Sequence, residues 1–152
     1  MAFFDGYDVA VSGMSAQRTR INVVSANIAN AKTTHTEDGG PYKKQNVVFE
    51  EVLLKENQKQ SNNIDKSLNE TSDLSLRKVG VKSIVEDDSK PVMRYEPSHP
   101  DANEEGYVAY PDINPVVEMV DLIEAMRSYE ANVATFNTHK NIDAKTLDII
   151  KV

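Results

Sequence analysis

The last third of the chain, NPVVEMVDLIEAMRSYEANVATFNTHKNIDAKTLDIIKV (residues 114–152), decides the fold. Asn114 is a favourable N-cap and Pro115 fits the first helical position. No proline or glycine follows before the end of the chain. The stretch therefore predicts one helix of about 36 residues, which at ~1.5 Å per residue is about 54 Å long.

One side of this helix carries residues at alternating spacings of three and four, the pattern of a heptad seam. The seam is apolar except at Lys140 and Asp143, and its members are Met119, Leu122, Met126, Tyr129, Val133, Phe136, Lys140, Asp143, Leu147 and Ile150. A helix this long exceeds what a chain of 152 residues buries inside its own globule. It needs a second helix, from this chain or from a neighbour.

The first segment, residues 2–31, provides a second seam at the opposite end of the chain. Spacings of four and three connect Phe3, Tyr7, Ala10, Met14, Gln17, Ile21, Val24, Ile28 and Ala31. Gly6 and Gly13 lower the helix propensity, so the first turns are expected to be the weakest. Two helices alone make a marginal structure, and we expect them to depend on neighbouring subunits.

Two asparagines near the end of the first helix have two interpretations. The side-chain amides of Asn27 and Asn30 can fix the register against a neighbouring helix, as buried polar residues do in coiled coils. Alternatively, they cap the helix locally and remain exposed, with Asn30 as the left-handed residue at the C-terminus. The sequence leaves both open.

The helical period is lost between the two seams, where short β-strands are predicted. They are Tyr42–Val52, Val79–Val85, Val92–Tyr95 and Tyr107–Tyr110, with a turn at Gly39-Gly40-Pro41 and a polar loop at Lys55–Asp73. The expected fold class is α+β: two long terminal helices packed as a coiled-coil-like hairpin, with a small β-rich middle module. The expected divisions are residues 1–33, 34–113 and 114–152.

Composition excludes several classes of function. The chain has no cysteine, which removes disulfides, thiolate metal sites and a cysteine nucleophile. Its net charge is −7, with eight acidic residues against two basic ones in residues 86–112, so a nucleic-acid partner is not expected. No apolar run reaches the ~20 residues of a membrane span, and direct membrane insertion is not expected. The N-terminus does not resemble a secretory signal, which by general secretion rules indicates the cytoplasm, except for substrates of dedicated exporters.

Two candidate chemical sites occur in the acidic segment. An EF-hand-like spacing connects Asp101, Asn103, Glu105, Gly106 and Asp112, but prolines flank it where an EF-hand needs helices. His99 beside Asp101 resembles a base and its orienting acid, but no nucleophile motif accompanies the pair. An acidic turn and a His-Pro turn are the simpler explanations. We therefore expect no enzyme activity, cofactor or metal site.

Charges on the C-terminal helix also have two interpretations. Glu124 and Glu130 each lie three residues from Arg127, so both can pair with it along the helix surface. The alternative is that Arg127, with its neighbour Tyr129, recognises another subunit.

Several motifs resemble the flagellar axial proteins, the family of rod, hook and hook-associated proteins. Residues 25–33 (SANIANAKT) resemble the family's N-terminal signature, and residues 118–132 (EMVDLIEAMRSYEAN) its C-terminal helix signature. The middle motifs at 40–42 (GPY), 47–51 (VVFEE), 95–103 (YEPSHPDAN) and 106–111 (GYVAYP) are similar to the proximal rod members. The polar stretch 55–73 departs from them in length, and Met126 stands where relatives often carry glutamine.

The resemblance implies a structural subunit of the basal-body rod, exported without a cleaved signal by the flagellar type III apparatus. It further implies helical polymerisation in the periplasm with copies of itself and other rod proteins, contacts with MS-ring and hook–basal-body components, torque transmission and an export channel lined by the terminal helices. A soluble helical export chaperone or adaptor, or another rod or hook subunit, is the alternative.

Packing within or between subunits is expected to involve both seams. The residues assigned to it are Met14, Ile21, Val24, Asn27, Ile28, Asn30, Met119, Leu122, Met126, Arg127, Tyr129, Val133, Phe136, Leu147 and Ile150.

Overall fold

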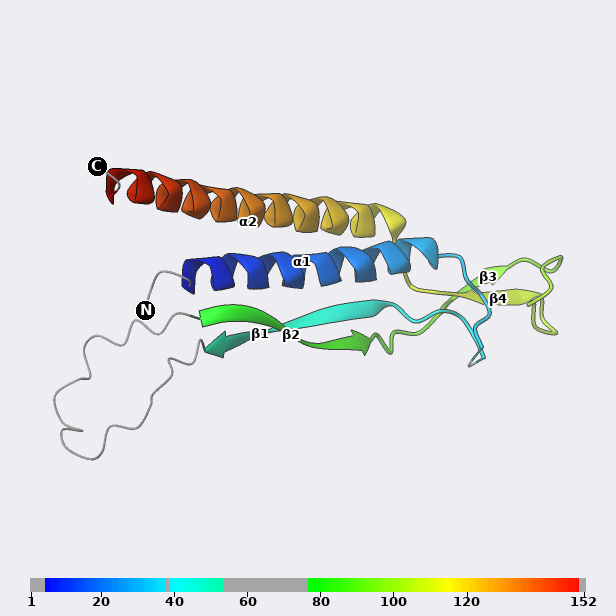
Figure 1. Cartoon of the computed structure of the whole chain (residues 1–152). Coiled ribbons are helices and arrows are strands. Elements are labelled where there is room, and N and C mark those ends of the chain that lie inside the picture. Colours follow the sequence, from blue (N-terminus) through cyan, green and yellow to red (C-terminus); the bar gives the residue numbers. More distant parts are fainter. Residues whose placement is uncertain (1–4, 38, 54–76, 151–152) are drawn as a thin grey trace, which may run out of the picture.

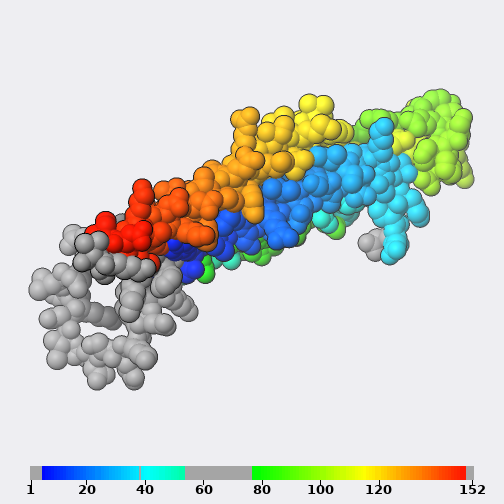
Figure 2. Space-filling view, turned by 45° about the horizontal axis from the view of Figure 1, so that its top comes forward, coloured from blue at the N-terminus to red at the C-terminus, as the bar shows by residue number. Residues whose placement is uncertain are grey.

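The computed structural model describes residues 5–37, 39–53 and 77–150, and these form an elongated molecule with two long antiparallel helices (Figures 1 and 2). The predicted polar loop at Lys55–Asp73 lies outside the described residues. The elements in chain order are α1 (Asp5–Ala29), β1 (Gln45–Leu53), β2 (Arg77–Glu86), β3 (Val92–Tyr95), β4 (Tyr107–Tyr110) and α2 (Pro115–Ile150).

Helix α2 begins as the sequence predicts. The side-chain Oδ1 of Asn114 accepts a hydrogen bond from the backbone N–H of Val116 at 3.0 Å, and its carbonyl accepts from the N–H of Glu118 at 3.1 Å. The cap thus satisfies one of the free N–H groups of the first turn. No described helix has an apolar stretch long enough to cross a membrane.

Helix α1 is the middle layer, with α2 on one side and the β1–β2 ribbon on the other (Figure 1). Its buried positions are small or β-branched: Ala10, Ala16, Val23 and Val24, together with the polar Asn27. Small side chains permit a close approach of both neighbouring layers, so the core runs along α1.

The antiparallel register of the two helices repeats every seven residues. A Cβ atom at Gly6 would lie 3.1 Å from Cε1 of His139, and one at Gly13 would lie 2.9 Å from Nδ2 of Asn132. Two heptads further along α1, Asn27 meets Glu118, two heptads back along α2 from Asn132. The glycines therefore form notches for side chains of α2, a role that the sequence analysis did not foresee.

Strands β1 and β2 form a long antiparallel ribbon. The register runs from Gln45 opposite Glu86 to Leu53 opposite Arg77, with an irregularity between Val48 and Phe49. Both strands were predicted, although β1 begins at Gln45 rather than at Tyr42.

The second hairpin lies beyond the ends of the helices, at the end of the molecule away from the C-terminus (Figure 1). Strands β3 and β4 occupy the predicted ranges, with Val92 opposite Tyr110 and Tyr95 opposite Tyr107. Gly106 before β4 has φ +82° and lies against the ring of Tyr95, where a Cβ would approach within 2.9 Å. Glycine is required there both for the backbone conformation and for the contact. The predicted α+β fold, a terminal helix hairpin with a small β middle, is confirmed.

Replacing Gly13 distinguishes a packing notch from a weak helix position. If the glycine only weakens α1, Gly13→Ala stabilises the chain by about 0.5–1 kcal/mol. We expect the opposite, a loss of about 1 kcal/mol, because the new methyl group meets Asn132. Thermal unfolding followed by circular dichroism measures this, and the double variant Gly13→Ala/Asn132→Ala should recover stability. A stabilised single variant would contradict the notch.

Candidate assembly interface

Only part of the predicted seam of α2 lies on the side toward α1. Leu122, Tyr129, Phe136 and Asp143 are half-buried on this side. However, Met119 is 51% and Met126 46% exposed, and Lys140 and Leu147 are also exposed. The preceding residues are turned inward instead, and these are Glu118 (1% exposed), Ala125 (0%), Asn132 and His139.

The reason for this correction is the close approach of the helices. Gly6 and Gly13 leave room for His139 and Asn132, and the carboxylate of Glu118 has polar partners in the interior. An interpretation based on apolar residues alone selects the methionines. Of the other predicted packing residues, Val24 is buried and Met14, Ile21, Ile28 and Val133 are half-buried. Phe3 and the side chain of Ile150 lie outside the described part.

Asn27 is the centre of a polar network that joins three separate segments of the chain. Its Nδ2 donates to the carbonyl of Gln45 at 2.9 Å and to Oε2 of Glu118 at 3.2 Å. Its Oδ1 accepts from the N–H of Gln45 at 2.9 Å and from the hydroxyl of Tyr42 at 3.1 Å. Burial, aided by the charges of Glu86 and Glu118, raises the pKa of Tyr42 above its ordinary value.

Lys44 completes what we call the Asn27 network (Asn27, Tyr42, Lys44, Gln45 and Glu118). Its Nζ lies 2.6 Å from Oε1 of Glu118, an ion pair that is not aligned as a regular hydrogen bond. The side chain of Glu118 is 2% exposed and that of Lys44 is 25% exposed. A buried carboxylate without a cation is strongly unfavourable, so Lys44 and Asn27 are needed for Glu118 to face α1.

Asn30 has the local role instead. Its Nδ2 donates to the carbonyl of Ala26 at 2.9 Å, and its Oδ1 accepts from the hydroxyl of Thr33 at 3.1 Å. Of the two interpretations that the sequence left open, tertiary packing therefore applies to Asn27 and local capping to Asn30.

A second polar contact lies one heptad from Asn27. The guanidinium of Arg20 is 3.4 Å from a carboxylate oxygen of Asp121 and 3.7 Å from one of Glu124. Of the two interpretations of Arg127, the intrahelical pairs with Glu124 and Glu130 are therefore not formed, and Glu124 contacts Arg20 on the other helix instead. Among the described residues Arg127 forms no ion pair within 4 Å, and it is exposed.

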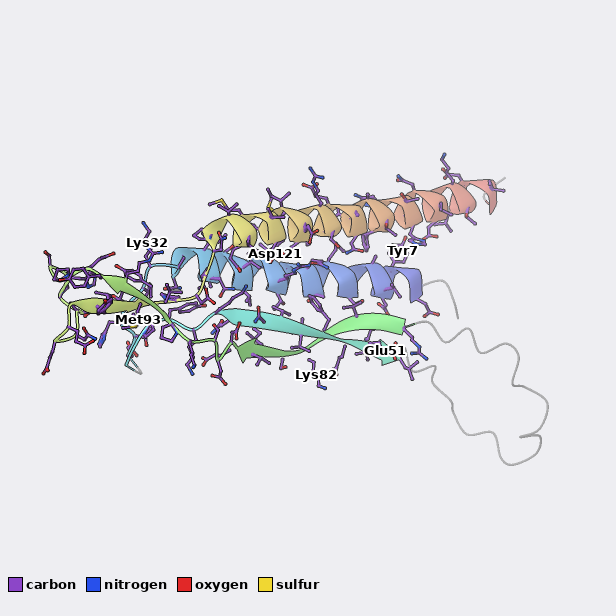
Figure 3. All side chains as sticks on the ribbon, turned by 180° about the vertical axis from the view of Figure 1, so that it is seen from behind. Tyr7, Lys32, Glu51, Lys82, Met93 and Asp121 are labelled. Atoms are coloured by element: carbon purple, nitrogen blue, oxygen red, sulfur yellow. The ribbon has the colours of Figure 1, made fainter. Side chains whose placement is uncertain are left out.

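Tyr7 joins the helices at their other end, and Figure 3 shows Tyr7 and Asp121 at the helix interface. The Tyr7 hydroxyl donates a hydrogen bond to Asp143, and the ring contacts Phe136 edge-on with centroids 5.1 Å apart. The hydrogen bond to the carboxylate, with desolvation and the negative charge of Asp143, raises the pKa of Tyr7 to about 12. This contact explains the acidic residue in the predicted seam.

Apolar side chains are exposed on another side of the first half of α2. We call this the outer α2 stripe, and its members, 46–68% exposed, are Val116, Met119, Val120, Ile123 and Met126. Their spacing of three or four residues between neighbouring turns makes them contiguous on the helix. A contiguous apolar surface rimmed by polar residues is typical of protein–protein contacts.

The acidic segment uses its candidate ligands to shape a turn. Oδ1 of Asn103 accepts from the N–H groups of Glu105 and Tyr107, and Asp101 accepts from the hydroxyl of Thr34 at 2.7 Å. Nδ1 of His99 accepts from the N–H of Asp101 at 3.1 Å. Within the described ranges, no group of three or more His, Asp or Glu side chains is arranged to hold a metal ion.

The chain is similar over almost its whole length to curated rod proteins. It is 37% identical to the flagellar basal-body rod protein FlgC of Borreliella burgdorferi over 99% of both chains. It is 39% identical to that of Bacillus subtilis, over 99% of this chain and 100% of the relative. The protein of Escherichia coli O157:H7 is 34% identical over 98% of both. The chain belongs to the FlgC family of flagellar basal-body rod proteins. It is a structural subunit of the rod in the flagellar basal body.

Two family models match the segments that contain most of α1 and α2. The model described as "Flagella basal body rod protein" matches residues 8–34, and "Flagellar basal body rod FlgEFG protein C-terminal" matches residues 104–149. Asn27 lies in the first match and Glu118 in the second, whereas Lys44 lies in neither. The motifs quoted from the sequence contain three members of the Asn27 network, Asn27, Tyr42 and Glu118, and miss Lys44 and Gln45. The seven-residue spacing of Gly6, Gly13, Arg20 and Asn27 was the available signal for the true contact side of α1.

Removing the amide of Asn27 should strongly destabilise the subunit. Asn27→Ala leaves buried partners unsatisfied on Gln45 and Glu118, and we expect a loss of about 3 kcal/mol. Asn30→Ala is the matched control, with an expected loss of about 0.5–1 kcal/mol because its bonds are local. Chemical denaturation of both variants measures the difference, and equal losses would refute the tertiary role of Asn27.

The Tyr7–Asp143 contact predicts a sensitivity to high pH. The pKa of Tyr7 is raised in the folded state to about 12 from an ordinary value of 10.0. The stabilisation is therefore complete below about pH 10 and is lost as the pH rises toward about 12. The unfolding free energy of the wild type should fall more steeply across this range than that of Tyr7→Phe. Parallel curves for the two proteins would contradict the contact.

Proposed function

We propose that this FlgC-family chain polymerises helically with copies of itself and other rod proteins through its terminal helices. In this proposal it is exported without a cleaved signal by the flagellar type III apparatus and assembles in the periplasm. Neighbouring MS-ring and hook–basal-body components contact it, and the assembled helices transmit motor torque and line the export channel. The role is mechanical, without catalysis, nucleic-acid binding or direct membrane insertion.

The observation that carries the proposal is the outer α2 stripe. Helix α2 already has an intramolecular partner in α1, yet Met119 and Met126 remain half-exposed on another side. Burying such side chains against a neighbour is favourable by roughly 25 cal/mol per Å2 of apolar surface. An elongated hairpin that keeps a second apolar surface open is suited to lateral packing in a helical assembly.

The predicted packing residues of α2 divide into two groups, those that face α1 and those that are exposed. Leu122, Tyr129 and Phe136 lie on the side toward α1 and hold the hairpin together. Met119, Met126 and Leu147 are exposed, and we assign them to neighbouring subunits. Exposed Arg127 directly follows Met126 and is placed to select the partner by charge.

The packing of α1 against α2 also provides stiffness, which a subunit that transmits torque requires. Each helix is braced along its length by contacts seven residues apart, from Gly6 with His139 to Asn27 with Glu118. A braced helix pair resists bending better than a single helix, so load passes through the hairpin rather than through the hairpin's loops.

A charge in the outer α2 stripe should block assembly without unfolding the subunit. Met126→Asp is expected to abolish motility and incorporation into detergent-insoluble basal bodies, because an unpaired carboxylate would be buried at the subunit contact. The exposed Thr135→Asp, outside the stripe, is the control and should assemble. Complementation of a strain lacking the native subunit, with immunoblotting of purified basal bodies, measures both.

Normal incorporation of Met126→Asp would overturn the proposed packing surface. A wild-type chain that stays soluble as a small discrete oligomer, while basal bodies sediment without it, would instead support the adaptor alternative.

A further inference from the structure

Helix α2 carries two overlapping sets of residues that could face α1. Four positions belong to both sets: Leu122, Tyr129, Phe136 and Asp143. The inner set found in the structure adds Glu118, Ala125, Asn132 and His139, and the alternative set adds Met119, Met126, Val133 and Lys140. Successive residues lie ~100° apart on a helix, so a rotation of α2 by roughly 50° exchanges the two sets.

Apolar burial alone favours the alternative set. The rotation would bring two methionines, the already half-buried Val133 and Lys140 toward α1, in place of a glutamate, an alanine, an asparagine and a histidine. The four shared positions, including Asp143 with its hydrogen bond to Tyr7, would stay near α1 in either orientation. Contacts of the inner set must therefore hold the observed orientation.

The strongest of these contacts is made by Glu118. Its two carboxylate oxygens are held by different segments, Oε2 by Asn27 at 3.2 Å and Oε1 by Lys44 at 2.6 Å. Rotation would withdraw the carboxylate from both and leave the donors of Asn27 and Lys44 without it. Because a buried carboxylate is tolerated only with its partners, the network opposes rotation directly.

We propose that the Asn27 network fixes the rotational orientation of α2 and thereby keeps the apolar side with Met119 and Met126 exposed. Lys44 is the positioning residue, because it supplies the charge that makes the inward orientation of Glu118 possible. The use of the exposed side in assembly rests on the proposed function, whereas the orientation itself is a property of the single subunit.

Single engineered cysteines report the orientation, because the chain contains no natural cysteine. Ala125→Cys probes the inner set, Met126→Cys the alternative set, and Ile123→Cys a position 52% exposed in the outer α2 stripe. The rate of maleimide labelling is measured on the purified full chain, with sucrose present to stabilise the folded state. In the otherwise native chain the thiol at 125 should react slowly and those at 126 and 123 rapidly.

Removing the charge of Lys44 should then rotate the helix. In Lys44→Met, the rate at 126 is expected to fall and that at 125 to rise by about tenfold, the size of a modest shift in local opening, with no change at 123. Lys43→Met is the matched control, since the Lys43 amine pairs with Glu86 and Asp88 at a site where its side chain is 56% exposed. The double variant Lys44→Met/Glu118→Gln should restore the native rates, because a neutral amide can remain beside Asn27 without a cation.

Unchanged rates at 125 and 126 in a helical Lys44→Met chain would overturn the proposal. A uniform rise at all three positions would also overturn it, because that result indicates loosening rather than rotation. If circular dichroism shows that Lys44→Met does not fold, Lys44→Gln takes its place, because a polar side chain at 44 can still contact Glu118 without supplying a charge. It should shift the rates in the same direction but less, and unchanged rates there would again refute the proposal.

Failure of the proposed function gives a different result. If the labelling rates shift as expected but Lys44→Met enters basal bodies normally, the network sets the orientation and the outer α2 stripe is not the subunit contact. If the rates do not shift while Met126→Asp fails to assemble, the contact surface stands and the network does not orient it.

Discussion

A buried carboxylate is the constraint on which the rest of the structure depends. Glu118 lies in the first turn of α2, almost inaccessible to solvent, between the amide of Asn27 and the ammonium of Lys44. Neither partner alone satisfies both oxygens, so the end of α1, the segment before β1 and the start of α2 must meet at one point. Removing one partner of such a pair leaves a buried charge uncompensated, which is strongly destabilising. We infer that this cost opposes a slip of the two helices by seven residues, because a slip would separate Glu118 from Asn27 and Lys44.

The consequence is an unusual distribution of side chains over α2. Small and polar residues alternate with Leu122, Tyr129 and Phe136 on the side toward α1, where Gly6 and Gly13 let the helices approach closely, while Met119 and Met126 remain exposed. A helix hairpin built only for its own stability would bury the methionines. In this rod subunit of the FlgC family, the same distribution leaves an apolar side of α2 exposed, and we propose that neighbouring subunits cover it.

Local signals in the sequence were sufficient for the elements and insufficient for their orientation. The Asn114 cap, the absence of glycine and proline after Pro115, and the strands β3 and β4 were all predictable, because each depends on neighbouring residues. The small and polar members of the contact side of α2 were missed because a heptad pattern is found by counting apolar residues, whereas this contact depends on glycine notches in α1 and on Lys44. No spacing rule connects Lys44 with Glu118, since the chain returns through four strands before they meet. The sequence motif identified Asn27 as a candidate. Its hydrogen-bond partners in the structure were needed to show that its role is tertiary packing and not helix capping.

Oxidative footprinting of the native methionines tests the central claim most directly, because thioether oxidation follows solvent exposure and needs no substitution. Met119 and Met126 should oxidise faster than half-buried Met14 in the free subunit and become protected in purified basal bodies. Slow oxidation of Met119 and Met126 in the free subunit, or equal oxidation before and after assembly, would contradict the central claim.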